Sequence, residues 1–538
     1  MQYSRYTEQI TAAEWRWVLI LATALVILAM LPFALVPVAL NGQSRSFMGV
    51  VHDPQEAASA LASVRLGVQN EWLWRDLHTP EPQRGIVSDS LYIVLGQIAR
   101  ISRLDPLALF HVARALAALF MFHALYALSA AIWTRVNSRR IFWLLASVGA
   151  GVGWIVAPLI QQATPDIQIS LMFPFHAVLT NVHLPLAVGC ISFLVAAMLD
   201  SLRPDFDAMP AVTNGGLTLI VFSITLALIF PQAFAPLGIA YGLSLAFEAA
   251  RRKSTQRSLQ WFGWFIIPAL PLIVYNIIVV LGNPLIMELW QLDAQDNVPT
   301  LAHLLIALGL PLVIALPGLW RALRRFESDG SAFMLIWLIA MLVLAYTLPF
   351  IRGQFLFGLM LPIAYFAARA SGDFWFPLIR QRYWRFRLVA ALIPVLVASQ
   401  AVALLAPLSD ALPAMTLPSD YAAAFTYLRG RQSDAVVLSA APVGIWLPAW
   451  TGKQVVAASP DLTLDFTGKS AAVARWYAAS DPATCEALLS RLPSRSTPYE
   501  VRYVIVGPVE RRLGTAACAA GLVEMARFNT VTVYLVTR

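Results

Sequence analysis

The chain has 538 residues, of which 59% are hydrophobic and only 13% are charged, and its mean hydropathy is +0.68. Soluble globular proteins are about half apolar and carry more charge, so this composition excludes that class and indicates a protein whose solvent is the bilayer. The formal net charge of +8 does not indicate nucleic-acid binding, because the basic residues fall in short clusters between apolar runs and so report topology.

The apolar runs are long enough to cross a bilayer, which takes about 17 to 25 residues. The first run, 15–40, is too long for a signal-peptide core and lacks a small-residue cleavage site, so we predict an uncleaved first span. The predicted spans are 15–38, 107–133, 141–160, 180–200, 215–230, 232–250, 260–282, 300–320, 331–350, 353–371 and 388–407. The fold class is therefore mainly α, a polytopic bundle of about eleven spans.

A cytoplasmic N-terminus would place every basic cluster on one side of the membrane. Those clusters lie at 135–140, 251–257, 321–325 and 380–387. The loops assigned to the opposite side, 161–179 and 283–299, contain acidic residues and no Lys or Arg. This pattern predicts a multi-pass protein of the plasma membrane whose C-terminus is extracytoplasmic.

Two larger segments would then face outward. The loop 39–105 shows helical periodicity at 56–68 and 88–101, with apolar faces that suit helices on a membrane surface. The segment 408–538 alternates Ala-rich helical stretches with short β-rich runs at 435–440, 454–459, 503–508 and 532–537. We predict a membrane module over 1–407, including that loop, and a small α/β domain over 408–538.

The three cysteines do not form a metal-binding cluster. Cys190 lies within a hydrophobic run, whereas Cys485 and Cys518 lie in the polar C-terminal segment. These two could form a disulfide in an oxidising compartment or remain free thiols.

The string VHDPQE follows the first span closely and contains the main acidic candidates, Asp53 and Glu56, beside His52. One interpretation is local, with Asp53 as a helix N-cap, Pro54 at the first helical position and Glu56 completing a capping-box-like start. The other makes Asp53 a general base that takes a proton from an acceptor hydroxyl as it attacks an activated sugar. The two interpretations are compatible.

The layout of one span, an outward loop opening with an acidic residue, many further spans and an outward domain resembles the GT-C superfamily of membrane glycosyltransferases. The strings DPQEAASALASVRLG, WLWRDLHTPEP, LFHVAR and IRGQFLFGLMLPIA add to the resemblance. Two departures are that Gly353 and Gln354 stand after Arg352, where consecutive basic residues are expected, and that Pro54 takes the place of a second acidic residue after Asp53.

The resemblance implies inverting transfer of a sugar from a polyprenyl-phosphate-linked donor to an extracytoplasmic glycan, lipid or protein. A phosphate leaving group needs cations, and Arg352 lies at an outward boundary between late spans. Its alternative role is to snorkel to the interface. His111 and Arg114 lie one turn apart at the outward end of the second span, where they could bind the donor phosphate, and Arg114 could instead pair with groups of another helix.

His183, Asp166 and His52 are further candidate substrate contacts. A histidine at the start of a span, such as His183, is more often a buried hydrogen-bonding residue than a ligand. If Asp53 is not the base, Glu56 or Asp166 would be next. No ligand spacing predicts a metal site or a cofactor, although Asp53, His52, Asp166 and His183 could meet in space around a divalent ion.

Two other functions compete with the enzyme. A transporter or flippase of lipid-linked substrates is disfavoured by the scarcity of ionisable residues within the spans and by the lack of an internal repeat. A non-catalytic GT-C-like protein remains an alternative because the acidic and basic motifs are incomplete. Membrane lipids are expected partners in each case, and nucleic acid is not.

Overall fold

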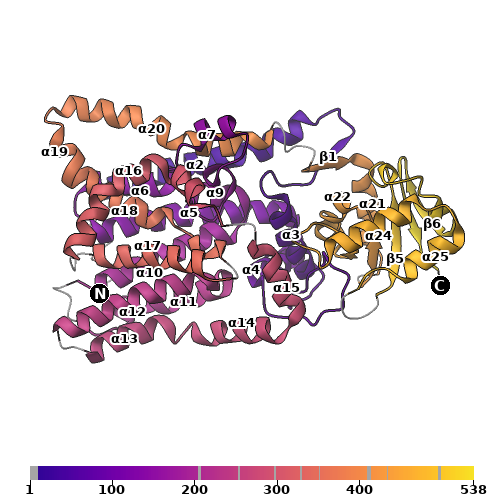
Figure 1. Cartoon of the computed structure of the whole chain (residues 1–538), viewed down its shortest axis with the longest axis horizontal. Helices are drawn as coiled ribbons and strands as arrows, with labels where there is room; N and C mark the ends of the chain where they lie inside the picture. Colours follow the sequence, from indigo (N-terminus) through magenta and orange to yellow (C-terminus); the bar gives the residue numbers. More distant parts are fainter. Residues whose placement is uncertain are drawn as a thin grey trace. The chain divides into compact units, whose positions relative to one another are not determined.

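The computed structural model describes residues 10–203, 208–252, 255–295, 298–326, 330–349, 352–408, 414–432, 434–494 and 499–537 (Figure 1). Parts of the predicted basic segment 251–257 and of the loop 283–299 lie outside these residues. The chain divides into two compact units. The first comprises Met1–Met30, Ala113–Ile278 and Ala294–Ala406, and the second Leu31–Val112, Val279–Asp293 and Pro407–Arg538. The second unit thus contains both the loop 39–105 and the C-terminal segment. The division predicted at residue 407 stays a prediction.

Helices make up the part of the chain predicted to span the membrane. They are α2 (Ala12–Ala39), α5 (Pro106–Ile132), α6 (Val136–Val148), α7 (Gly153–Ile160), α8 (Pro165–Gln168), α9 (Pro174–Thr180), α10 (His183–Ser201), α11 (Gly216–Ile229), α12 (Phe234–Arg252), α13 (Thr255–Ile266), α14 (Leu270–Gly282), α15 (Pro284–Gln295), α16 (Leu301–Arg325), α17 (Ser331–Thr347), α18 (Met360–Ala370), α19 (Phe376–Leu378) and α20 (Arg382–Leu405). Short helical turns are η1 (Val212–Asn214), η2 (Pro231–Ala233), η3 (Gly353–Leu356), η4 (Ser371–Trp375) and η5 (Ala406–Leu408).

The described helices match the predicted spans closely. Eight are long and apolar enough to cross a membrane, or nine when α13 and α14 count as one bent span. The predicted spans 215–230 and 331–350 correspond to the shorter apolar helices α11 and α17. The span predicted over 260–282 is bent by 55°. Pro268 lies at this bend, and it lacks the N–H that would continue the helical ladder. The sidedness of the spans stays a prediction.

The connection 161–179 belongs to the first unit, and most of its residues from 164 onward are buried. It carries α8 and α9, and every residue of α9 is buried. The backbone N–H groups of Gly358 and Met360 donate to the carbonyl oxygens of Leu171 at 2.9 Å and Met172 at 3.3 Å. Irregular backbone inside a helical bundle needs such partners, because its polar groups are otherwise unsatisfied.

The two helices predicted in the loop 39–105 are present as α3 (Pro54–Val68) and α4 (Ser90–Ser102). They pack closely where two glycines meet, since a Cβ on Gly67 would lie 2.1 Å from the carbonyl oxygen of Ile93. A Cβ on Gly96 would lie 2.1 Å from that of Val64. The face of α3 predicted to suit a membrane surface is therefore largely buried against protein, with ten buried residues between Ala57 and Gly67.

The C-terminal segment forms the predicted α/β domain (Figure 1, orange to yellow). Its five-stranded sheet has the order β4-β3-β5-β7-β6, parallel from β4 to β5 and antiparallel from β5 to β6. The strands are β3 (Val436–Leu438), β4 (Gln454–Val455), β5 (Val501–Val506), β6 (Val523–Phe528) and β7 (Val531–Leu535). The helices are α21 (Ser419–Arg429), α22 (Ala441–Gly444), α23 (Leu447–Thr451), α24 (Phe466–Ala478) and α25 (Pro482–Ser490), with turns η6 (Glu510–Arg512) and η7 (Ala517–Gly521). A separate two-stranded sheet pairs β1 (Arg45–Phe47) with β2 (Thr416–Pro418).

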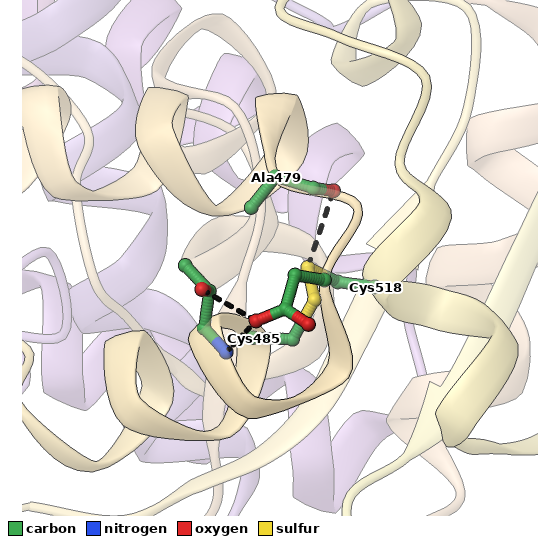
Figure 2. Close-up of a disulfide and its surroundings, with 5 residues drawn as sticks. Ala479, Cys485 and Cys518 are labelled. Carbon is green, nitrogen blue, oxygen red and sulfur yellow. Dashed lines mark hydrogen bonds between the residues drawn. A yellow bond between two sulfur atoms is a disulfide. The ribbon is translucent and has the colours of Figure 1, made fainter.

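A disulfide links Cys485 in α25 to Cys518 in η7 (Figure 2). The two Cα atoms are 5.4 Å apart, and the Sγ atom of Cys518 lies 3.4 Å from the carbonyl oxygen of Ala479. Both cysteines are buried beside Trp476 and Val504 in one core cluster of the domain. Of the two alternatives for these cysteines, the structure contains the disulfide, which suits an oxidising compartment.

Candidate active site

Asp53 occupies the N-cap position of α3, as the capping interpretation predicts. Its backbone is left-handed, with φ 43° and ψ 70°, and Pro54 occupies the first helical turn. The Oδ1 atom accepts a hydrogen bond of 3.2 Å from the backbone N–H of Glu56. The side chain is nevertheless exposed to solvent. Asp53 is therefore an N-cap whose carboxyl group is still open to a reaction partner.

The surroundings of Asp53 change its acidity. Protein packed around the exposed carboxyl group partly desolvates it and so raises the pKa of Asp53. Hydrogen bonds from the backbone and the side chain of Glu56 oppose that rise. A carboxylate with a raised pKa is a stronger base than an ordinary aspartate.

The turn before Asp53 is held by α5. His52 is buried, and Gly49 has a φ of 98°, which favours glycine. The Nε2 atom of His111 lies 2.9 Å from the carbonyl oxygen of Gly49, and the centroid of its ring lies 4.9 Å from that of Phe33, with the two rings tilted. These contacts give His111 a role in fixing the turn that carries Asp53, and its predicted contact with a donor phosphate stays a prediction.

Arg114 is fully buried on α5, one turn after His111. Its guanidinium donates to the carbonyl oxygens of Leu179 at 3.0 Å and Thr180 at 3.5 Å, and it lies 3.1 Å from the Sδ atom of Met30. These carbonyls end α9, so a cation there complements the negative end of the helix. The structure thus shows the alternative that Arg114 pairs with groups of another helix, and its phosphate-binding role stays a prediction.

Asp166 is also fully buried, in α8. Its Oδ2 atom accepts a hydrogen bond of 3.0 Å from the N–H of Gly153, the first residue of α7. The packing is tight, since a Cβ on Gly153 would lie 2.2 Å from the Oδ1 atom of Asp166 and 2.0 Å from the Oγ1 atom of Thr164. Asp166 therefore supports the start of α7, and its predicted substrate contact remains untested.

His183 and Arg352 both belong to the first unit. The ring of His183, the first residue of α10, stacks on Phe230 at 6.3 Å, and Phe230 stacks on Phe357 at 4.2 Å. Arg352 is half-buried just before η3, five residues from Phe357. Within the described ranges its Nε atom is buried without a hydrogen-bond partner. An unsatisfied buried donor on a cation is what a bound phosphate or water would complete.

The predicted residues thus fall into two groups. Asp53, Glu56, His52 and His111 belong to the second compact unit, and Arg114, Asp166, His183 and Arg352 belong to the first. In the part of the chain that the structure describes, no three His, Cys, Asp or Glu side chains are grouped so as to hold a metal ion.

Sequence reasoning missed two buried ion pairs. Glu14 in α2 pairs at 3.0 Å with Arg139 in α6 and also accepts a hydrogen bond of 2.7 Å from the Oη atom of Tyr126. Glu81 of the loop 39–105 pairs with Lys469 in α24, and both side chains are fully buried. Neither pair has a local signal, because the partners are 125 and 388 residues apart along the chain.

Solved structures share this fold. The chain aligns with the oligosaccharyltransferase of Archaeoglobus fulgidus in its apo form at a TM-score of 0.54 and 13% identity, over 91% of this chain and 69% of that one. It aligns with ArnT from Cupriavidus metallidurans bound to undecaprenyl phosphate at a TM-score of 0.54 and 14% identity, over 97% of this chain and 98% of that one. No protein-family model and no curated protein sequence matches the chain. Both neighbours are GT-C glycosyltransferases, and the predicted GT-C fold is confirmed.

Proposed function

We propose that this chain is a membrane glycosyltransferase that moves a sugar from a polyprenyl-phosphate-linked donor to an extracytoplasmic acceptor, with inversion at the anomeric carbon. Asp53 is the general base of this reaction, and Arg352 is the main cation for the donor phosphate. The observation that carries the proposal is the state of Asp53, a carboxyl group that is solvent-exposed, held at the start of α3 and raised in pKa by its surroundings.

The proposed reaction requires one proton transfer to a group of the protein. As the acceptor oxygen attacks the anomeric carbon, Asp53 takes the hydroxyl proton, a bond forms from that oxygen to the sugar, and the bond from the sugar to the phosphate oxygen breaks. The electron pair of the broken bond stays on the polyprenyl phosphate. A guanidinium such as that of Arg352, whose Nε atom has no partner within the described residues, can stabilise this growing negative charge.

The structural neighbours support the substrate class. The ArnT structure contains undecaprenyl phosphate, and a second structure of the Archaeoglobus enzyme is tethered to an acceptor peptide. A polyprenyl-phosphate donor and an acceptor outside the cytoplasm are therefore the substrates that we propose for this chain. The identity of the sugar is left open.

Asp53→Asn tests the proposal because it removes the base while keeping the helix cap. Asparagine caps helices nearly as well as aspartate and also tolerates the left-handed conformation. Loss of general-base catalysis lowers turnover by about 10² to 10⁴-fold. We expect a fall of that size in the transfer of labelled sugar from a polyprenyl-phosphate donor to membrane-derived acceptors, with no change in the thermal midpoint in detergent.

Asp89→Asn is the matched control. Asp89 is also a left-handed aspartate at a helix start, with φ 47°, and its Oδ2 atom accepts a hydrogen bond of 2.9 Å from the Oγ atom of Ser63. Because this carboxyl group is engaged between α3 and α4, transfer by Asp89→Asn should stay within about twofold of the wild type. Equal losses in the two variants would mean that the charge of the loop matters and that Asp53 is not the base.

The capping bond from Glu56 also favours a second candidate, a GT-C-like protein without catalytic activity. In that case Asp53 serves only α3. The two candidates diverge in the same assay, since a non-catalytic protein gives no transfer in the wild type and no difference between the two asparagine variants.

A further inference from the structure

The first outward loop reaches the C-terminal domain through a small hairpin of residues 74–86, which we call the clasp. Its ends are joined by two backbone hydrogen bonds, from the N–H of Trp74 to Ile86 at 2.8 Å and from the N–H of Ile86 to Trp74 at 3.0 Å. Residues 76–81 at the tip are all buried. A loop containing Asp, His and Glu is normally solvated, so complete burial of this tip indicates a specific docking contact.

The tip docks along the outer edge of the sheet. The N–H of Val455 in β4 donates to Leu77 at 3.1 Å, and the side-chain amide of Gln454 donates to the carbonyl oxygen of Thr79 at 3.0 Å. The Oγ1 atom of Thr463 donates to the carbonyl oxygen of His78 at 2.7 Å. The clasp thereby covers the edge that β4 would otherwise present to solvent.

A buried charge pair lies at the centre of this contact. The Nζ atom of Lys469 pairs with Glu81, and neither side chain is exposed. Thr79 bridges the pair, since its Oγ1 atom donates to Glu81 and accepts from Lys469 at 3.2 Å. Burial lowers the pKa of Lys469, and the contact with Glu81 opposes that shift. Removal of either partner would leave a buried charge uncompensated, which is costly, whereas removal of both is far milder.

The same domain also holds the helix that begins at Asp53. The Nε atom of Arg65 in α3 donates to the carbonyl oxygen of Ala449 in α23 at 3.3 Å. On the other side of Asp53 along the chain, β1 pairs with β2 of the C-terminal segment. Asp53 therefore lies between two stretches of chain that are both bonded to this domain. Helix α3 is a stiff link of about 22 Å between Asp53 and the segment that leads into the clasp.

We propose that Glu81 and Lys469 are positioning residues, whose pair docks the clasp on the C-terminal domain and so holds α3 and Asp53 in the geometry for proton transfer. The inference rests on the proposed function of Asp53. It gives the C-terminal domain a role in placing the base, in addition to any contact with the acceptor.

The test compares Glu81→Gln with Glu524→Gln in the full-length protein. Glu524 forms an exposed pair at 2.7 Å with Arg527 on β6 of the same domain, so the control removes the same charge from a pair that docks nothing. We expect Glu81→Gln to speed amide hydrogen exchange in α3 and to lower kcat at least about tenfold, with the KM for the donor within about twofold. The control should change none of these.

A double variant, Glu81→Met with Lys469→Met, separates positioning from simple loss of folding. It removes both charges and keeps apolar side chains of similar length, so it should restore slow exchange in α3 and most of the turnover. Unchanged exchange in α3 for Glu81→Gln would overturn the inference, and so would faster exchange with undiminished kcat. If the wild type transfers no sugar, the proposed function fails, while the exchange comparison still decides whether the clasp holds α3.

Discussion

Asp53 and Asp166 are acidic residues of two segments predicted to face outward, and both accept a hydrogen bond from the start of a helix. Asp53 caps its own helix and keeps an exposed side chain, whereas Asp166 supports a different helix and has no exposed surface. Only the first arrangement leaves a carboxylate that a substrate hydroxyl can approach without repacking. A carboxyl group that is both exposed and held in place locally is therefore a candidate base, whereas a buried one has a structural role. The position of the residue in the sequence does not distinguish the two.

The contrast extends to the chain around each residue. The turn before Asp53 depends on one glycine with positive φ and on a hydrogen bond from His111. Asp166 instead sits under Gly153 in a buried segment, where α8 and α9 pack among the longer helices. Changes at the two places should consequently affect different properties, namely activity around Asp53 and stability around Asp166.

Gly153→Ala should give the largest loss of stability. The new methyl group would lie 2.0 Å from the Oγ1 atom of Thr164 and 2.2 Å from the Oδ1 atom of Asp166, and both oxygens are buried. Overpacking of this kind costs about 1 to 3 kcal/mol. Thermal unfolding in detergent measures the effect, with Gly372→Ala as the control, because no atom beyond the local backbone lies within 4 Å of a Cβ built there. Equal midpoints for the two variants would show that Asp166 has room to move.

Asp166→Asn should have a smaller effect on stability and almost none on activity. The amide oxygen can still accept from Gly153, but the favourable charge at the start of α7 is lost, at a cost of about 0.3 to 1 kcal/mol. Sugar transfer should stay within about twofold of the wild type. A variant with an unchanged thermal midpoint and abolished transfer would instead make Asp166 the base and remove that role from Asp53.

The sequence was sufficient for features that depend on neighbouring residues. The Asp-Pro pair at 53–54 predicted the start of α3, and apolar run length predicted the positions of the spans. It was insufficient where distant parts of the chain meet. Nothing near Glu81 indicates Lys469, and nothing near Asp166 indicates that Gly153 is its partner. The strand β6 was missed because none of its residues is buried and because they include Glu524 and Arg527, which weaken the apolar alternation of a strand.

The smallest expected effect is a shift in pH dependence when Glu56 is replaced. A general base must be ionised, so kcat/KM should fall as the pH drops through the raised pKa of Asp53. The side chain of Glu56 hydrogen-bonds Asp53 and lowers its pKa, so Glu56→Ala should raise the pKa further and move the acid limb to higher pH, by less than about one unit.

A pH profile of transfer for the wild type, Glu56→Ala and Glu71→Ala measures this shift, because Glu71 is an exposed acid of the same loop. A shift of the acid limb to lower pH in Glu56→Ala would mean that the negative charge of Glu56 dominates over its hydrogen bond. An identical profile in all three proteins would mean that the group titrating on the acid limb is not Asp53. Because α3 keeps its cap in Glu56→Ala, through the backbone N–H of residue 56, such a result could not be attributed to a lost helix start.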